Sequence, residues 1–337
     1  MTKVIEITDK SRAYIGNAVE LLHELLPEKR VIIISDSNID RTHSDLVQSY
    51  EHILIGLGEQ AKSLTTLDEI YRKLIELGAD RSTFILGIGG GIVTDVAGFV
   101  ASTYMRGVEF GFITTTLLGA VDASIGGKNG VNIGGFKNMV GTFSQPRFVI
   151  YDVALLHSLS DREFRAGLAE VIKTAVLGDK ELFELLESTS FEELRQDEEL
   201  LNKIIIRSVK VKASVVAEDE QEGGRRRILN LGHTVAHAIE KCTSKFSHGE
   251  AVAIGLFHIT NSASDLKIMP ESDAQRIVSL IEKFGFKTAL PIEHKQLLDA
   301  IKGDKKRKGN SLHIILPTGI GSVEDRLVDF DELGTLI

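Results

Sequence analysis

The sequence predicts a chain of two domains, an α/β domain built on a parallel sheet followed by a mainly α-helical domain. In the first 150 or so residues, short β-branched runs alternate with amphipathic segments, whereas after about residue 160 apolar residues recur at helical spacing. The chain has 337 residues, of which 43% are hydrophobic, enough for two cores. We place the domains at 1–158 and 159–337, although no Pro/Gly-rich linker marks the boundary.

Four apolar runs in the first domain are predicted to be buried strands. They are RVIIIS at 30–35, STFILGIGGG at 82–91, FGFITTT at 110–116 and RFVIYD at 147–152, and a helical segment at 65–78 separates the first two. Strands alternating with helices favour a parallel sheet covered on both faces, as in Rossmann-like nucleotide-binding domains.

The second domain opens with a helix start signal. Ser160 and Asp161 precede the run DREFRAGLAEVIKTAVLG, which has helical periodicity, and most of the chain from there to Phe284 is helix-like too.

Composition excludes several classes of protein. The formal net charge of −9 argues against general nucleic-acid binding. The sequence has no stretch of 18 apolar residues without a charge, so we expect no membrane span. The N-terminus lacks the apolar core of a signal peptide, and the single cysteine, Cys242, cannot form an internal disulfide. We therefore expect a soluble cytoplasmic protein.

Glycines at the end of the second predicted strand could form a phosphate-binding turn. Gly87, Gly89, Gly90 and Gly91 precede a helix, where backbone N–H groups can approach an anion. The spacing is not G-x-G-x-x-G, so a simple tight turn is an equal alternative. Asp36 and Asn38 follow another strand, where an Asp can bond a ribose hydroxyl or cap a helix.

Three histidines and a glutamate suggest a metal site. His233 and His237 are four residues apart in LNLGHTVAHAIE and share a helix face, and His248 begins the next predicted helix, whose positive end would keep its ring neutral. Glu170 lies within an apolar helical stretch. One carboxylate and two histidines can bind a catalytic zinc, but the spacing does not say which two, and surface or core histidines are the alternative.

Several cations accompany these segments and suggest a phosphorylated anionic substrate. Lys173 follows Glu170 by three residues, so both can face one pocket. The others are Lys128, Lys137, Lys212, Arg226 and the run Lys305–Lys308. Each alone could be a solvated surface group.

Six motifs in order strongly resemble the 3-dehydroquinate synthase family. They are GGGIVTDVAGFVASTYMRG, TTLLGAVDASIGGK, FKNMVGTFSQP, AGLAEVIK, EGGRRRILNLGHTVAHAIE and HGEAVAIG, and the resemblance runs from about Ser35 to Pro317. It implies a dehydroquinate synthase-like fold.

The resemblance also implies site residues. Zinc or cobalt would be bound by Glu170, His233 and His248, and His237 would contact substrate. NAD would be bound by Asp36, Asn38, Glu59, Lys62, Gly89, Gly90, Gly91, Asp95, Thr115, Thr116, Lys128, Lys137 and Ser158. Further substrate contacts would be Asp122, Lys128, Asn138, Lys173, Lys212, Arg226, Asn230 and one of Lys305 and Lys306. Arg106 would reach the phosphate of a substrate bound to the neighbouring subunit, which implies a homodimer.

The activity implied by the resemblance is conversion of 3-deoxy-D-arabino-heptulosonate 7-phosphate into 3-dehydroquinate and phosphate, with NAD regenerated. Sister sugar phosphate cyclases of the amino-dehydroquinate or deoxy-inosose type, a glycerol dehydrogenase-like enzyme and a non-catalytic nucleotide-binding protein are the alternatives. The sequence departs from the family at Asn129 and Gly130 and in the following IGGFKN. Because both departures lie beside Lys128 and Asn138, we expect any change in substrate choice to arise there.

Overall fold

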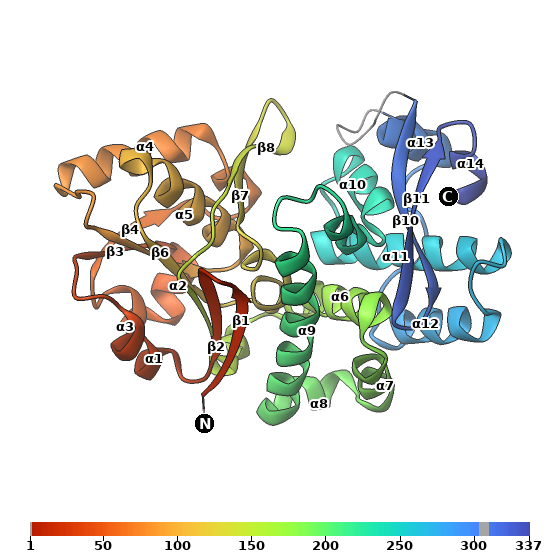
Figure 1. Ribbon diagram of the computed structural model, residues 1–337, viewed down its shortest axis with the longest axis horizontal. Coiled ribbons are helices and arrows are strands. Elements are labelled where there is room, and N and C mark those ends of the chain that lie inside the picture. The colour runs from red at the N-terminus through yellow and green to blue at the C-terminus, as the bar shows by residue number, and fades with distance from the viewer. Residues whose placement is uncertain (1, 303–309) are drawn as a thin grey trace. The chain divides into compact units, whose positions relative to one another are not determined.

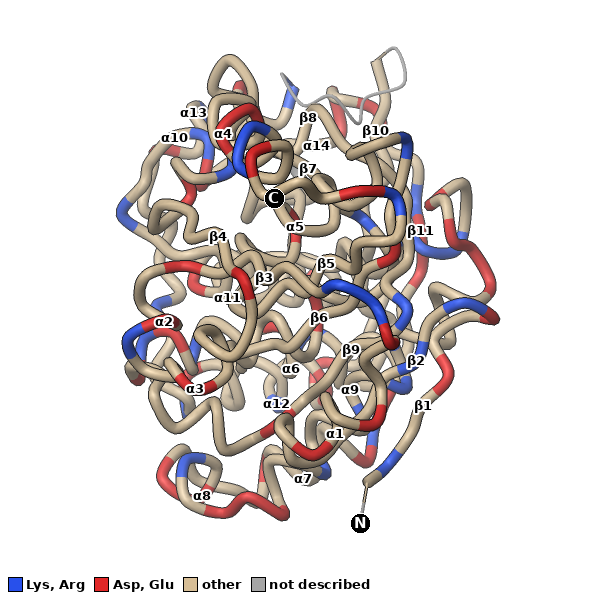
Figure 2. The backbone as a smooth tube through the Cα atoms, turned by 90° about the vertical axis from the view of Figure 1, so that its left-hand side faces the viewer, with Lys and Arg blue, Asp and Glu red and all other residues tan. Residues whose placement is uncertain are grey.

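The computed structural model describes residues 2–302 and 310–337 and divides the chain into two compact units (Figure 1). The first unit ends at Ser160 and the second begins at Asp161, two residues beyond the boundary drawn from the sequence. Among the described residues, no helix is long and apolar enough to cross a membrane. Basic and acidic residues alternate with other residues along the chain (Figure 2).

The first unit is built on a seven-stranded sheet. Its strands, in spatial order, are β1 (Lys3–Thr8), β2 (Ser11–Ile15), β9 (Phe148–Tyr151), β6 (Phe110–Thr114), β5 (Phe84–Gly89), β3 (Val31–Asp36) and β4 (Glu51–Ile55). Only β1 and β2 pair antiparallel. The four strands predicted from the sequence are β3, β5, β6 and β9, and the parallel sheet is confirmed. The sequence analysis did not predict β4 or the β1–β2 hairpin.

Both faces of the central strands are buried, which is why β3, β5, β6 and β9 are largely apolar. Val31 and Ile33 of β3 pack in a core with residues of helices α1 (Ala18–Leu25) and α3 (Ser44–Val47). Ile32 and Ile34 point to the opposite face and are also fully buried. Helices α4 (Leu64–Glu76) and α5 (Gly91–Thr103) belong to the same unit, and α2 (Ser37–Thr42) follows β3.

The order of the strands reverses between β3 and β5. From β3 the chain proceeds to β4 at the sheet edge and then returns to β5 on the other side of β3. Ligands of open parallel sheets bind outside the carboxyl ends of strands at such a reversal. Asp36 ends β3 and Gly89 ends β5, so both lie at this position.

A second hairpin packs on α5. It consists of β7 (Lys128–Ile133) and β8 (Phe136–Phe143), and it follows the π-helical segment Gly119–Ala123. Strand β7 contacts α5, whereas most of β8 is exposed. This hairpin carries Asn129, Gly130, Lys137 and Asn138, and the sequence analysis did not predict it.

The second unit is mainly helical, as predicted. It contains α6 (Asp161–Gly178), α7 (Lys180–Ser188), α8 (Phe191–Gln196), α9 (Glu198–Glu218), α10 (His233–Cys242), α11 (His248–Asp265), α12 (Glu271–Lys283), α13 (His294–Lys302) and α14 (Leu333–Leu336). A hairpin of β10 (Ser311–Gly319) and β11 (Ser322–Asp329) completes it, with the 3-10 segment η5 (Arg225–Asn230) before α10.

Candidate metal and nucleotide sites

Three helices of the second unit bring Glu170, His233 and His248 together. Glu170 lies in the middle of α6, and the two histidines are the first residues of α10 and α11. One oxygen or nitrogen from each lies within 4.8 Å of the others. Glu170 Oε1 is 3.6 Å from His233 Nε2 and 3.2 Å from His248 Nε2.

Glycines beside the two histidines allow the helices to approach this closely. A Cβ on Gly249 would lie 2.0 Å from the carbonyl oxygen of Ala166 in α6, and one on Gly255 would lie 2.0 Å from that of Gly232. Gly232 also has φ +75°, a left-handed conformation that favours glycine at the start of α10. The backbones of α10 and α6 therefore lie directly against α11.

These three residues offer donor atoms of the kind that bind a divalent metal. His233 Nδ1 lies 3.1 Å from the carbonyl oxygen of Leu231, and His248 Nδ1 lies 3.4 Å from Glu240. Both acceptors require Nδ1 to carry a proton, so in the neutral rings each Nε2 directs a lone pair toward Glu170. With both rings neutral, two nitrogen lone pairs and a carboxylate oxygen converge on one position, which a cation could occupy. This set fits zinc or cobalt.

Lys173 fixes the other oxygen of Glu170. Its Nζ lies 2.5 Å from Glu170 Oε2, and both side chains are almost completely buried. The lysine thus compensates the buried carboxylate from one side, and Oε1 faces the histidines. The i,i+3 relationship predicted from the sequence has this geometry.

The two histidines differ in protonation in the metal-free chain. Burial lowers the pKa of His233 to about 3, so its ring is neutral. Burial also opposes protonation of His248, but hydrogen bonds with Glu170 and Glu240 outweigh it and raise its pKa to about 10. The helix terminus favours a neutral His248 ring, whereas the two carboxylates favour the protonated ring in the metal-free chain. Metal binding there must displace a proton.

The other predicted groups of the second unit lie on nearby segments. The His237 ring centroid is 5.3 Å from that of His233, although His237 is not part of the donor triad. Arg226 is almost fully buried and donates to the carbonyl of Glu220, while its backbone N–H donates to Asp219. Asn230 Nδ2 donates to Glu222 Oε1, and Lys212 is a buried residue of α9. Lys305 and Lys306 lie outside the described residues.

In the first unit, a polar cluster joins three segments. Lys62 Nζ lies 2.5 Å from Asp95 Oδ2 of α5 and 2.7 Å from Asn138 Oδ1 of β8. Burial raises the pKa of Asp95, although the Lys62 ammonium opposes this. Three predicted residues, from the NAD and substrate sets, are thereby brought together.

Asn132 organises this cluster and was missed from the sequence. Its side chain donates to Glu59 Oε1 at 2.8 Å and accepts from the backbone N–H of Asn138 at 2.9 Å. Asn138 has φ +51°, so the bond supports an uncommon backbone conformation. Asn132 follows no recognisable motif, and only the pairing of β7 with the segment after Glu59 reveals it.

The glycine loop forms a tight strand-to-helix turn, as one reading of the sequence proposed. A Cβ on Gly89 would lie 2.5 Å from Val93, and one on Gly90 would lie 2.8 Å from Thr116, so larger residues do not fit. Gly90 is the N-cap of α5 and offers no side-chain acceptor. The turn therefore leaves room for an anion at a 13-residue helix N-terminus.

The remaining predicted nucleotide and substrate contacts of this unit lie on several segments. Asp36 caps α2, accepting through Oδ1 from the N–H groups of Asn38 and Ile39. Thr115 is buried, and its backbone N–H donates to the carbonyl of Gly89. The Oγ of Ser158 lies 3.1 Å from His43 Nε2. Lys128, Lys137 and Arg106 are exposed, and Asp122 is half-buried in the π-helical segment. Arg106 has a left-handed backbone, φ +72°.

The departure at Asn129 and Gly130 is explained by packing. Asn129 is 5% exposed, and its Nδ2 donates to the carbonyls of Gly127 and Ser144. Its side chain occupies the place where a Cβ on Gly98 would lie. Gly130 pairs with Gly141 across the hairpin. The side chain of Asn129 thus has a structural role in the hairpin.

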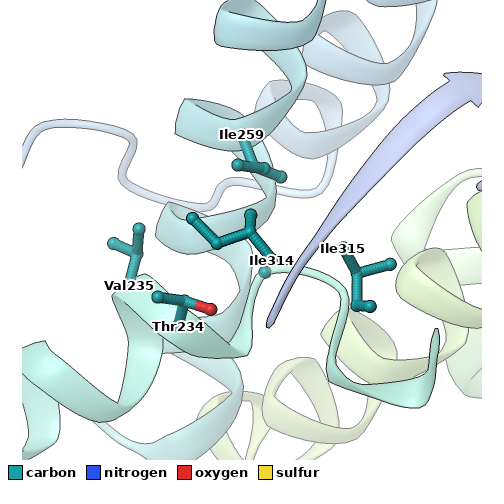
Figure 3. Close-up of a pocket in the computed structure, with 6 residues that line it drawn as sticks. Thr234, Val235, Ile259, Ile314 and Ile315 are labelled. Carbon is teal, nitrogen blue, oxygen red and sulfur yellow. The ribbon is translucent and has the colours of Figure 1, made fainter. Parts of the chain in front are cut away.

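The second unit also has a small apolar pocket at the start of α10 (Figure 3). It is lined by Gly232, Thr234, Val235, Ile259, Ile314 and Ile315, none of which has a titratable side chain.

A Rossmann-like unit with a glycine turn at a helix N-terminus, together with a helical unit that carries a two-histidine, one-carboxylate cluster, is the combination expected of an enzyme that uses a dinucleotide and a divalent metal. The 3-dehydroquinate synthase N-terminal pattern matches residues 52–166, and the 3-dehydroquinate synthase C-terminal pattern matches residues 167–307. The chain belongs to the 3-dehydroquinate synthase family, and it is an enzyme. The resemblance inferred from the six motifs is confirmed.

Curated relatives agree with this assignment. The 3-dehydroquinate synthase of Leptospira interrogans is 44% identical over 301 residues, covering 88% of this chain and 82% of the relative. That of Alkaliphilus metalliredigens is 38% identical over 317 residues, covering 91% and 89%.

Solved structures of sister cyclases share the whole fold. A 2-deoxy-scyllo-inosose synthase complexed with carbaglucose-6-phosphate, NAD⁺ and Co²⁺ has a TM-score of 0.88 at 27% identity, covering 99% of this chain and 98% of that chain. A 2-epi-5-epi-valiolone synthase from Streptomyces hygroscopicus with NAD⁺ and Zn²⁺ bound has a TM-score of 0.88 at 26% identity, covering 99% and 96%. A probable glycerol dehydrogenase from Sinorhizobium meliloti, at 16% identity and a TM-score of 0.59, shares the fold alone.

Proposed function

We propose that the chain is a cytoplasmic 3-dehydroquinate synthase of the shikimate pathway, an NAD- and metal-dependent carbon–oxygen lyase. It would convert 3-deoxy-D-arabino-heptulosonate 7-phosphate into 3-dehydroquinate and inorganic phosphate. The observation that carries this proposal is the donor triad Glu170, His233 and His248 in a chain about 40% identical to synthases of this name. Sister cyclases and glycerol dehydrogenase are less favoured, because their identities to this chain are 27% or less.

The cofactors supply chemistry that no side chain here provides. When bound, NAD would supply reversible hydride transfer at the C5 alcohol, and a divalent ion would supply Lewis-acid polarisation of its oxygen. Glu170, His233 and His248 would bind the ion. The turn at Gly89, Gly90 and Gly91 and the residues Asp36, Asn38, Glu59, Lys62, Asp95, Thr115, Thr116, Lys137 and Ser158 would bind NAD.

The chain's own charges would manage the substrate phosphate and the developing enolate. Buried cations interact with anions more strongly than exposed ones, because water screens them less. Lys173, Lys212 and Arg226 are almost completely buried, which supports such a role. Lys128, Asn138, Asp122, Asn230, His237 and one of Lys305 and Lys306 would complete the substrate contacts.

A homodimer would complete the phosphate contacts, with Arg106 acting across the subunit interface. The exposed position of Arg106 supports this. Mixing two inactive variants, Arg106→Ala and Glu170→Gln, tests it. If Arg106 serves the partner, a mixed dimer has one intact site and regains activity; a mixture that stays inactive after subunit exchange contradicts the proposal.

Phosphate release from the heptulosonate phosphate, with NAD and zinc present, tests the overall function. Nicotinamide absorbance is followed in the same sample, and His233→Ala is compared with His294→Ala, which removes an exposed histidine at the start of α13. We expect phosphate without net NADH, lost only in His233→Ala.

Other outcomes identify the alternatives. Phosphate released from glucose 6-phosphate but not from the heptulosonate phosphate would indicate a sister cyclase. Net NADH from a simple polyol would indicate a glycerol dehydrogenase-like enzyme. NAD binding with neither reaction would leave a non-catalytic nucleotide-binding protein.

A further inference from the structure

Glu240 contacts the metal-binding histidine that begins the next helix. It lies on α10, seven residues after His233 and thus on the same helix face. Its side chain is only 6% exposed, and both of its carboxylate oxygens lie 3.4 Å from His248 Nδ1. Neither the motif analysis nor the resemblance gave this residue a role.

This contact determines which nitrogen of His248 faces the metal position. A carboxylate accepts hydrogen bonds only, so the proton of a neutral His248 ring must reside on Nδ1. The lone pair then resides on Nε2, which lies 3.2 Å from Glu170 Oε1. Without the acceptor, the ring could take the other tautomer or rotate away.

His233 has a different support for the same purpose. Its Nδ1 proton is directed at the carbonyl of Leu231, a backbone group two residues earlier that substitution cannot remove. His248 depends instead on a side chain from another helix. Glu240 thereby couples α10, which carries His233, to α11, which carries His248.

We propose that Glu240 is a positioning residue for the divalent metal site, holding the His248 ring with Nε2 toward the ion. The inference rests on the proposed function, since it assumes that the triad binds a metal. Carboxylates that accept from the second nitrogen of a ligating histidine orient the ring and raise its basicity. A negatively charged acceptor also strengthens the bond relative to a neutral one.

Zinc affinity of the full-length protein tests this directly. The metal is removed, and zinc is titrated against a chromogenic chelator for the wild type, Glu240→Ala and Glu240→Gln. Ile239→Val, a conservative change at the adjacent fully buried position, controls for helix packing. The visible absorption of the Co²⁺-loaded proteins reports ligand geometry independently of activity.

We expect Glu240→Ala to weaken zinc binding by about 10- to 100-fold and to alter the Co²⁺ spectrum. Glu240→Gln should recover part of the affinity, because an amide oxygen still accepts from Nδ1–H, while Ile239→Val should bind as the wild type does. Zinc affinity of Glu240→Ala equal to that of the wild type overturns the proposal. If the alanine variant does not fold, wild-type affinity in Glu240→Gln overturns it instead. A wild type that binds no zinc at all contradicts the proposed metal site itself.

Discussion

Gly249 of α11 lies directly against the backbone of Ala166 in α6. A Cβ at Gly249 would stand 2.0 Å from the carbonyl oxygen of Ala166 and 2.5 Å from its Cα. Because Gly249 follows His248 and Ala166 lies one turn before Glu170, this contact sets the separation of two candidate metal ligands.

Gly249→Ala should therefore separate α11 from α6. The obstacle is backbone, which cannot rotate away, so we expect a loss of about 1–3 kcal/mol in the free energy of unfolding and weaker zinc binding. Urea unfolding and chelator competition measure the two effects. Gly334→Ala is the control, because the nearest atom to its new Cβ is a Leu298 methyl at 3.8 Å. Equal zinc affinity in Gly249→Ala and the wild type would contradict the prediction.

Removal of the metal should lower the thermal stability of the second unit. A metal that binds only the folded chain adds its binding free energy to the stability of the folded state. At a free zinc concentration about 100 times the dissociation constant, binding adds about 2.7 kcal/mol. Thermal unfolding with chelator, and again after zinc is restored, measures this; His233→Ala should show a much smaller zinc-dependent shift.

Gly98→Ala should destabilise the first unit despite its position within α5. Alanine favours helix by up to about 1 kcal/mol, but the new Cβ would lie 1.9 Å from Asn129 Oδ1. We expect a net loss of about 1–3 kcal/mol, measured by urea unfolding. Asn129→Ser shortens the opposing side chain, so the double variant should lose less than the sum of the single losses. Strict additivity would show that the two side chains do not compete for one space.

Lys62→Met should destabilise the first unit most at neutral pH. Removing one partner of a buried ion pair costs about 3–5 kcal/mol, and the lower end applies here because Asp95 can take up a proton. The pKa of Asp95 is already raised by burial, so its favourable contribution is present in acid and is lost as the pH rises through the folded pKa. Without Lys62 this pKa rises further, and the loss increases.

The measurement is the free energy of unfolding of Lys62→Met and of the wild type at a series of pH values from acid to neutral. Lys73→Met, which changes an exposed lysine of α4, is the matched control. A deficit that grows as the pH falls would have the wrong sign.

Asp219→Ala should disturb the segment that carries Arg226. The Asp219 carboxylate accepts from the backbone N–H groups of Arg226, Gly224 and Gly223, and these bonds lower its pKa. Its contribution is therefore present above the ordinary pKa of about 3.9 and is lost as the pH falls through the folded value. We expect a raised KM for the phosphorylated substrate at neutral pH. The stability difference from the wild type should shrink below about pH 4; an unchanged KM would separate this loop from substrate binding.

The parallel sheet was predictable because its central strands are continuous apolar runs. The helical second unit was predictable because its apolar residues recur at helical spacing. The run Val31 to Ser35 and the helical spacing around Glu170 report burial directly. The hairpin β7–β8 was not predictable in this way, since most of β8 is exposed and its glycines and polar residues have no clear alternation. Its pairing depends on contacts with α5 that are distant in sequence.

The sequence alone determined which residue types could bind a metal, and the motifs determined the family. Spacing left three histidines as equivalent candidates. The resemblance selected His233 and His248, and the tertiary structure brings those two together with Glu170. The close packing at Gly249 and Gly255 places two imidazoles beside Glu170, and it leaves His237 outside the donor triad. The tertiary structure also placed Glu240 against His248, and in the first unit the packing of β7 on α5 placed Asn129 against Gly98. Ligand geometry and side-chain competition depend on distances of a few ångströms between separate helices and strands, which local sequence patterns do not encode.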